Sequence, residues 1–388
     1  MIRTIVDVTI GVLILIHDVF ARILSLRFPY RLHLFEWCDL PVIPTFLKHC
    51  CQSTLTAQWT RRLPFLQSQP PSLHATHLLT QILSNITDSA RTPYTIVDFC
   101  SGAGGPLPSI EKAVNATRLK SKLCPVLFRL SDLVPNLEAW IPLSAQSEYL
   151  SFIPQSVNAL SPPPSTISVS ARSQIPLPST GHEFAYEEVS VTGKVHPDPR
   201  MEKQRQRDRQ EMRAEMTADT KVIHLFCLSF HHFADKEARV VVKNMLRDSD
   251  AFCILELQER SLGCLAMMAL EPVLLLAVCW WWFWGEWAYL WWTYGVPVLP
   301  FLHGWDGIVS CLRTRTFEEV RALVDGVIAE ESRERAKELT LNGQSKGRTR
   351  GLGPDQWTIS EAKVLHTWPA GYMHATVGIR KEIRKGMS

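Results

Sequence analysis

The sequence has little net charge and no regular cysteine spacing, and both absences narrow what the chain can be. Lys and Arg number 41 against 38 Asp and Glu in 388 residues, a net charge of +3, which is too small to indicate nucleic-acid binding. The ten cysteines include no Cys-x-x-Cys pair. The adjacent Cys50 and Cys51 lack metal-ligand spacing on both sides, so we predict no metal site. Several cysteines lie in apolar runs, which favours reduced thiols in a reducing compartment.

Two common nucleotide-binding motifs are also missing from the glycine-rich segment 94–106. There an apolar run leads to Asp98 and then to Gly102 and Gly104, and a helical pattern follows. This order predicts strand, tight turn and helix, with which a doubly wound sheet receives a nucleotide-like ligand. Leu107 stands where a dinucleotide fingerprint has its third glycine, and no Gly-Lys-Ser/Thr follows. NAD and a Walker A loop are therefore disfavoured.

Further apolar runs extend the predicted sheet. The run 125–131 ends at Asp132, an acid placed to accept hydrogen bonds from ribose hydroxyls. Runs at 222–228 and 251–257 predict buried strands on either side of a helix over 235–246. Two extended runs between Trp357 and Lys381 predict a terminal hairpin. Strand-helix-strand units of this kind define an α/β fold.

The glycine turn resembles a known cofactor motif. Asp98-x-Cys100-x-Gly102-x-Gly104 is similar to motif I of class I S-adenosylmethionine (SAM) dependent methyltransferases, Asp-x-Gly-x-Gly-x-Gly, with Cys100 in place of the first glycine. The whole chain resembles a largely fungal group of SAM-dependent methyltransferase-domain proteins through blocks at 97–106, 132–136, 229–233 and 305–320. The resemblance implies a Rossmann-like class I methyltransferase sheet, mostly parallel with an antiparallel C-terminal hairpin, and SAM as the cofactor.

The resemblance also implies a set of site residues. Members of the group carry a Val-Asp-Ala-like step after the third strand that faces the adenine. We expect this step at 187–191, with Ser190 in place of the acid. The predicted cofactor contacts are Asp98, Cys100, Ser101, Gly102, Gly104, Asp132, Leu133, Val189 and Ser229.

Two histidines are candidates for the chemistry. His231 and His232 follow the fourth predicted strand, at the edge where the ligand crevice of such a sheet opens. A neutral imidazole there can accept a proton from the methyl acceptor. The alternative is that one of the two is packed and hydrogen-bonded while the other is merely exposed.

The chain divides by composition into two regions. We predict an N-terminal helical region at 1–90 and a methyltransferase-like domain at 91–388. Within the second region, a Pro/Ser-rich and charged insertion at 155–218 reads as a flexible surface loop.

A second insertion, at 262–303, is apolar and rich in tryptophan. Its charged residues are Glu271 and Glu286, and seven of the chain's thirteen tryptophans lie between Trp280 and Trp292. Strands are predicted on both sides of it, so both flanks must join one sheet and a single membrane crossing is excluded. Contact with the membrane interface and a buried cap over the crevice are the two favoured alternatives. A double crossing of the membrane is less favoured than either.

The N-terminal apolar run at 5–24 lacks a small-residue cleavage site after it. This favours an amphipathic helix over a secretory signal.

These features support an active methyltransferase on a small-molecule or lipid-like acceptor, membrane-associated with the catalytic domain facing the cytoplasm. A soluble cytoplasmic protein is the alternative location. The alternative function is a degenerate methyltransferase fold that acts as a membrane-associated interaction protein. Cys100 and Ser190 favour the degenerate fold, while the Gly102/Gly104 turn and Asp132 favour the enzyme. Leu107 disfavours a NAD-dependent reductase.

Overall fold

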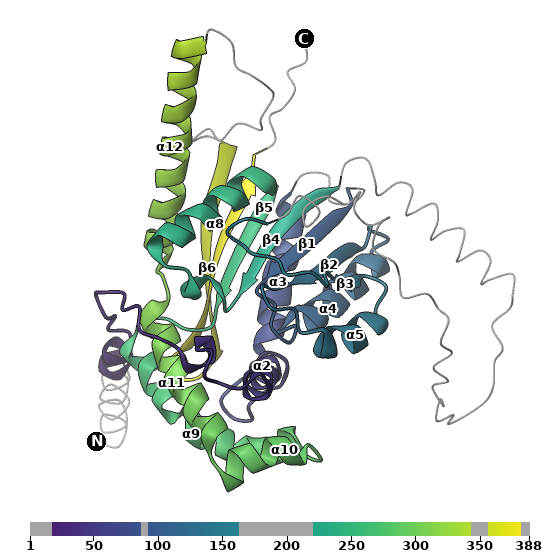
Figure 1. Cartoon of the computed structure of the whole chain (residues 1–388), viewed down its shortest axis with the longest axis vertical. Helices are drawn as coiled ribbons and strands as arrows, with labels where there is room; N and C mark the ends of the chain where they lie inside the picture. Colours follow the sequence, from purple (N-terminus) through teal and green to yellow (C-terminus); the bar gives the residue numbers. More distant parts are fainter. Residues whose placement is uncertain (1–17, 87–91, 163–219, 343–355, 382–388) are drawn as a thin grey trace, which may run out of the picture.

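The computed structural model describes residues 18–86, 92–162, 220–342 and 356–381, which are built around one seven-stranded sheet (Figure 1). The strand order is β3-β2-β1-β4-β5-β7-β6. The strands are β1 (Tyr94–Phe99), β2 (Val126–Ser131), β3 (Leu150–Phe152), β4 (Lys221–Cys227), β5 (Ala251–Glu256), β6 (Trp357–Thr367) and β7 (Gly371–Arg380).

The first five strands run parallel, and β7 lies antiparallel between β5 and β6. This confirms the predicted α/β sheet, mostly parallel with an antiparallel C-terminal hairpin. The strand order reverses between β1 and β4, whose registers pair Phe99 with Phe226. Such a switch point opens a crevice at the carboxyl ends of the strands.

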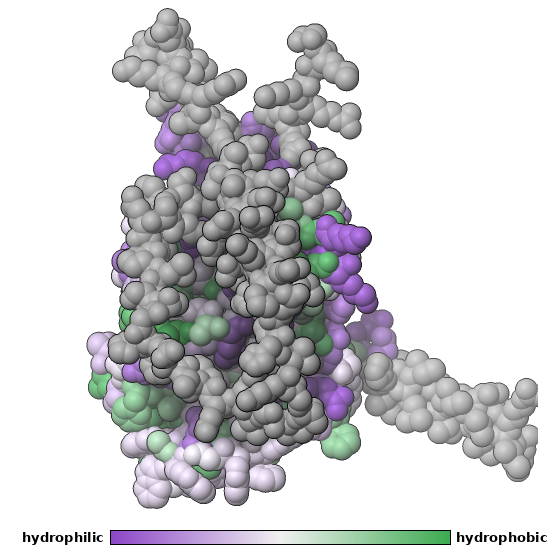
Figure 2. Space-filling view, turned by 90° about the vertical axis from the view of Figure 1, so that its right-hand side faces the viewer, coloured by the Kyte–Doolittle hydropathy of each residue, from purple (hydrophilic) through white to green (hydrophobic). Residues whose placement is uncertain are grey.

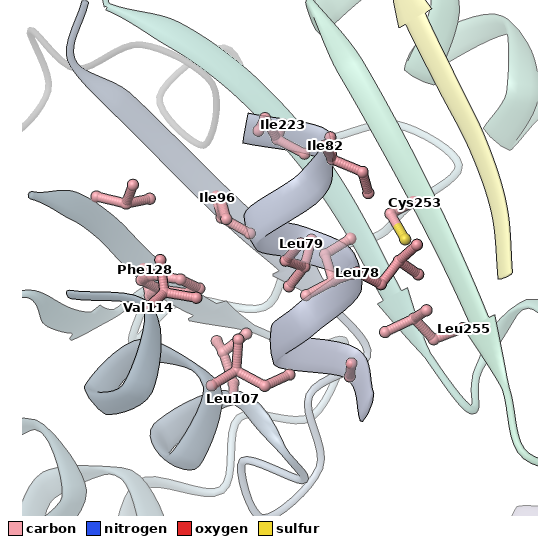
Figure 3. Packing of buried hydrophobic residues seen from close by; sticks show 14 of the residues in the cluster. Leu78, Leu79, Ile82, Ile96, Leu107, Val114, Phe128, Ile223, Cys253 and Leu255 are labelled. Carbon is pink, nitrogen blue, oxygen red and sulfur yellow. The ribbon is translucent and has the colours of Figure 1, made fainter. Parts of the chain in front are cut away.

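Successive side chains of the buried strands point to opposite faces of the sheet, and helices cover both of these apolar faces. Ile96 of β1 points to a core shared with α3 and α4, where it meets Leu79, as Figure 3 shows. The next residue, Val97, points to the opposite core, which contains residues of α8 and α12. The helices of these layers are α3 (Pro71–Asn85), α4 (Leu107–Lys120), α5 (Leu137–Ala145), α8 (Asp235–Asp248) and α12 (Phe317–Asn342).

The third strand lies earlier in the chain than we predicted. Leu150 of β3 pairs with Phe128 of β2, so the strand comes before the Pro/Ser-rich insertion and not within it. Only three residues long, it gives almost no periodic signal. The predicted adenine-facing segment at 187–191, including Val189 and Ser190, falls outside the described residues.

A third apolar core lies below the carboxyl ends of the strands, where the Trp-rich segment packs against helix α2 (Figure 1). Its elements are η1 (Trp37–Asp39), α2 (Thr45–Thr60), α9 (Leu262–Trp282), α10 (Trp287–Leu290), the short turn η4 (Trp291–Gly295) and α11 (Val298–Arg313). Among the described helices, α9 alone is long and apolar enough to cross a membrane, by length and composition only. The chain enters α9 from β5 and later returns as β7, which pairs with β5, so both flanks do join one sheet.

Candidate functional site

A cavity of about 680 Å³ opens at the carboxyl ends of the strands and is closed below by α2, α9 and α11. This volume lies near the middle of the range of about 300–1,000 Å³ that ligand sites occupy. We divide its wall into two zones. The strand-end zone contains Cys100, Ser101, Gly102, Asp132, Leu133, Asn158, Leu160 and Ser229. The helical zone contains Cys51, Leu55, Thr56, Met267, Met268, Glu271, Leu275, Val278 and His303.

The glycine turn after β1 forms the centre of the strand-end zone. The N–H of Gly102 donates to Asp132 Oδ2 at 2.9 Å, and the Trp140 indole donates to the Gly102 carbonyl at 2.8 Å. The φ of Gly102 is +51°, and a Cβ there would lie 3.4 Å from the side chain of Gln52 in α2. Three contacts therefore fix the turn: Asp132 after β2, Trp140 of α5 and Gln52 of α2.

Two residues without glycine's freedom take left-handed backbone conformations at this edge. Cys100 has φ +59° at the end of β1, and Leu228 has φ +51° after β4. Both line the cavity. Each such conformation costs about 1–2 kcal/mol for an L-residue, and backbone strain of this kind gathers at functional sites. Cys100 therefore adopts a backbone conformation that glycine takes at lower cost.

Two predicted cofactor residues lie behind the cavity wall. Asp98 is buried, and its Oδ2 accepts a hydrogen bond from Ser101 Oγ at 2.7 Å. Burial raises the pKa of Asp98 to about 8. Gly104 has φ +100°, and a Cβ there would meet Leu143 of α5 at 3.0 Å. Neither residue lines the cavity, so both positions shape the turn from behind.

The other predicted contacts at this edge do line the cavity. Asp132 accepts the N–H groups of Gly102 and Val134 through its two oxygens, at 2.9 and 3.0 Å. Leu133 is exposed beside it. Ser229 is buried after β4, and its hydroxyl donates to the Phe99 carbonyl at 3.4 Å. A carboxylate has about four lone-pair sites, so Asp132 keeps capacity for ligand hydroxyls.

Sequence reasoning missed Asn158. It follows β3, it is exposed, and it lines the cavity. The N–H of the preceding Val157 donates to the Asp132 carbonyl at 2.8 Å, which fixes the segment beside the acid. Residues 157–159 read Val-Asn-Ala, a Val-Asp-Ala-like step with an amide in place of the acid. This triplet is the signal that could have found the residue.

His231 is buried and held by acids on both ring nitrogens. Its Nδ1 lies 2.9 Å from Glu256 Oε2, and its backbone N–H donates to Glu256 Oε1 at 3.1 Å. Its Nε2 lies 3.7 Å from Glu36 Oε1. The bond to Glu256 favours a proton on Nδ1 and directs Nε2 towards Glu36. His231 also lines the cavity.

His232 belongs to a cluster of charges. Its Nδ1 lies 3.4 Å from Asp39 Oδ1 and its Nε2 lies 3.7 Å from Glu36 Oε2. Burial lowers the pKa of His232, but Glu36 and Asp39 outweigh it and raise the pKa to about 9. His232 and the Arg313 guanidinium hold the pKa of Asp39 well below its usual range, although burial acts in the opposite direction. Arg313 also lies 3.1 Å from Glu36.

Glu36, His231 and His232 offer ligand atoms within 4.8 Å of one another, a spacing that could hold a metal ion. The guanidinium of Arg313 already contacts Glu36 at 3.1 Å, and Glu256 already engages Nδ1 of His231. These contacts favour a charge network over a cation site. The prediction of no metal stays a prediction.

The wall of the cavity is rich in acids. Among the described lining residues, Lys48 and two histidines whose pKa is raised to about 9, His232 and His303, face six carboxylates: Glu36, Asp39, Asp132, Glu237, Glu271 and Asp306. A cavity of this sign favours cationic over polyanionic ligands.

No family model matches the sequence, and no curated protein matches it. Among solved structures, the chain is similar to magnesium protoporphyrin IX methyltransferase (ChlM) from Synechocystis PCC 6803 with bound SAM. The identity is 10% and the TM-score 0.32, over 88% of this chain and 100% of the other. It is similar to putative Zn-dependent alcohol dehydrogenases from Rhodobacter sphaeroides at 11% identity and TM-score 0.34, over 86% and 98% of the two chains. It is also similar to loganic acid methyltransferase with SAH at 9% identity and TM-score 0.28, over 81% and 94%.

Proposed function

We propose that the chain is a SAM-dependent methyltransferase that binds SAM in the strand-end zone. The observation that carries the proposal is the hydrogen bond between Gly102 and Asp132 at the switch point of the sheet. It brings the glycine turn and Asp132 together on one wall of the cavity, which supports a role for this acid in binding the ribose of a nucleoside cofactor. The strained backbone of Cys100 supports a functional turn. The amide of Asn158 takes the adenine-facing position.

The charge of the cavity favours SAM over a dinucleotide. A diphosphate needs helix N-terminal N–H groups or cationic side chains. Helix α4 begins at Leu107 with Pro108 in its first turn, and neither residue lines the cavity. Three cationic side chains, Lys48, His232 and His303, face six carboxylates there, so negative charge is in excess. SAM carries a sulfonium and an ammonium group, which this wall attracts.

In this proposal the methyl acceptor occupies the helical zone. Its wall is mostly apolar and holds a few buried polar groups, which suits a lipid-like molecule with one reactive polar group. Positioning of this group in line with the sulfonium methyl supplies much of the rate. His231, oriented by Glu256, is the better of the two predicted bases. His232 is held as a cation by its acids near pH 7 and acts through its charge.

We further propose contact with a membrane surface through the Trp-rich segment. The lower end of the molecule in Figure 2 is coloured green to near white, with few purple residues. The exposed aromatic side chains of the Trp-rich segment are Trp280, Trp281, Trp284, Trp287, Trp291, Tyr294 and Phe301, and the neighbouring α2 adds Phe46. Tryptophan at this density favours the headgroup level of a bilayer. Because α9 and α11 also wall the cavity, the proposed acceptor site lies next to the proposed membrane contact.

Calorimetric titration with SAM and S-adenosylhomocysteine tests the proposal directly. We expect dissociation constants in the micromolar range, about −8 kcal/mol, and no binding of NAD. Folded protein that binds neither sulfur nucleoside would contradict the enzyme and support the alternative, a degenerate fold acting as a membrane-associated interaction protein. Membership of the largely fungal group stays a prediction.

A further inference from the structure

Helix α2 of the N-terminal helical region contributes two polar side chains to the cavity wall near the glycine turn. Lys48 and Gln52 both line the cavity. They are four residues apart in the helix, a spacing that places two side chains on the same helical face, one turn from each other. The proposed binding of SAM through Asp132 and the glycine turn uses neither of them.

The amide of Gln52 is oriented with its donor group free. Its Oε1 accepts a hydrogen bond from Asn136 Nδ2 at 2.9 Å. Asn136 is buried, and its own Oδ1 accepts the backbone N–H of Ala139 at the beginning of α5. Because Asn136 engages the amide oxygen, the Nε2 of Gln52 is the atom left for a ligand, and it donates no hydrogen bond to the described residues.

Gln52 also lies against the backbone of the glycine turn. A Cβ on Gly102 would lie 3.4 Å from Gln52 Cδ and 3.6 Å from Gln52 Nε2. The N–H of the same glycine donates to Asp132, the acid proposed to bind the ribose. The free amide nitrogen and the proposed ribose partner are therefore neighbours of one glycine.

Lys48 is a cation that pairs with none of the acids around it. Six carboxylates share the cavity wall with this half-buried lysine, yet its ammonium group forms no ion pair or hydrogen bond with the described residues. A lysine on an open surface needs no partner beyond water. An unpaired ammonium group in an acid-rich wall is instead available to an anionic group of a ligand.

SAM carries one such group. Besides its sulfonium and ammonium groups it has a single carboxylate, which the excess of acids in the wall repels. Binding of this carboxylate in the cavity therefore requires a local cation and N–H donors. Lys48 supplies the charge, and the Gln52 amide supplies a donor beside the glycine turn.

We propose that Lys48 and Gln52 bind the carboxylate of the methionine part of SAM and thereby select a cofactor that has this group. The inference rests on the proposed function, because it assigns the anionic end of the same cofactor. It makes the N-terminal helical region part of the cofactor site, although this region precedes the glycine turn by about forty residues of sequence.

Calorimetry with two ligands tests the proposal on the folded full-length protein. The ligands are S-adenosylhomocysteine and decarboxylated S-adenosylhomocysteine, which differ by one carboxylate. We expect the wild type to bind the first ligand at least about 10-fold more tightly than the second, because hydrogen bonds to a charged group increase affinity by about 10- to 150-fold.

Variants assign this preference to the two side chains. Lys48→Met should weaken binding of S-adenosylhomocysteine about 10-fold without weakening binding of the decarboxylated ligand, and Lys48→Arg, which keeps the charge, should retain most of the preference. Gln52→Glu leaves an oxygen for Asn136 but replaces the amide nitrogen by a second oxygen. It should therefore also weaken the carboxylate-bearing ligand alone. Lys120→Met, at an exposed lysine outside the cavity wall, is the matched control and should change neither affinity.

The outcomes separate this inference from the proposed function. Circular dichroism identifies the variants that retain the fold. Selective loss of S-adenosylhomocysteine binding in both Lys48→Met and Gln52→Glu supports the carboxylate site, and selective loss in one alone overturns the role of the other residue. Equal wild-type affinities for the two ligands, or Lys48→Met that behaves like Lys120→Met, would overturn the carboxylate site and leave SAM binding in place. Folded wild type that binds neither ligand contradicts both proposals.

Discussion

The backbone N–H of Gly102 donates a hydrogen bond of 2.9 Å to the carboxylate of Asp132, thirty residues further along the chain. This contact joins the turn after β1 to the end of β2. The indole of Trp140 holds the carbonyl of the same glycine at 2.8 Å. The turn and the acid therefore form one unit, and a change at Asp132 affects both the ligand partner and the shape of the turn.

The first prediction concerns Asp132. Asp132→Asn keeps the shape of the side chain but removes the charge, so the cofactor loses charge-assisted hydrogen bonds worth about 1.5–3 kcal/mol. We expect S-adenosylhomocysteine to bind about 10- to 150-fold more weakly by calorimetry. Glu138→Gln, at an exposed acid on the neighbouring α5, should leave the affinity unchanged. Equal affinities for Asp132→Asn and wild type would show that the acid does not contact the cofactor.

The second prediction separates two candidates for the adenine-facing position. Asn158→Ala removes an amide from the cavity wall, and the loss of one neutral hydrogen bond of about 0.5–1.5 kcal/mol should weaken SAM binding about 2- to 13-fold. Val189→Ala tests the position that the sequence predicted. If Val189→Ala weakens binding and Asn158→Ala does not, the step after β3 is not the adenine contact.

The third prediction concerns the base. His231→Ala should lower methyl transfer about 10²- to 10⁴-fold, measured as tritium passed from labelled SAM into a lipid extract. Glu256→Gln should lower it by less and shift its pH profile, because this acid orients the His231 ring. SAM affinity should change little in either variant. Undiminished transfer in His231→Ala would assign the rate to positioning alone.

Local sequence patterns predicted the parts of this fold that are local. The apolar runs before Asp98 and Asp132 found β1 and β2, because strands buried on both faces are continuously apolar. The helical spacing of Ala238, Val241, Val242 and Leu246, which face the core, predicted α8.

Contacts between distant segments could not be predicted in this way. Glu36 meets Arg313 across 277 residues of chain, at 3.1 Å, and Gln52 of α2 reaches the glycine turn. No periodic pattern of apolar residues in the sequence indicates either contact. The three residues of β3 form a strand only because Phe128 offers a partner in β2, so a pattern search had nothing to detect.

The fourth prediction concerns stability and pH. The folded-state pKa of His232, about 9, lies above its ordinary value of 6.5. Its stabilising contribution is therefore fully present below about pH 6.5 and is lost as the pH rises through about 9. His232→Gln should lower the urea midpoint at pH 6, and the difference from wild type should shrink towards pH 9.5. His77→Gln, at an exposed histidine of α3, supplies the control. A difference that stays constant over this range would contradict the charge network.

The last prediction concerns the Trp-rich segment, where the structure separates two kinds of tryptophan. Trp280, Trp281, Trp284, Trp287 and Trp291 are 56–72% exposed, whereas Trp282 is 6% exposed. The carbonyl of Trp282 accepts a hydrogen bond from Arg61 of the N-terminal region. Serine at the five exposed positions should leave the fold intact and release the protein from sedimenting phosphatidylcholine vesicles, with loss of the fluorescence blue shift. Trp282→Ala should instead destabilise the domain by about 3–5 kcal/mol in urea unfolding.

Topology provides the stricter test of the same segment. Because β5 pairs with β7, a chain that entered the membrane at Leu262 must return to the same side before β7. Protease-accessible tags placed before Leu262 and after Trp305 should therefore be cleaved from one side of the membrane. Cleavage from opposite sides would contradict both the surface contact and the joining of β5 to β7. Unchanged vesicle binding by the five-serine variant would show instead that the exposed tryptophans do not face lipid.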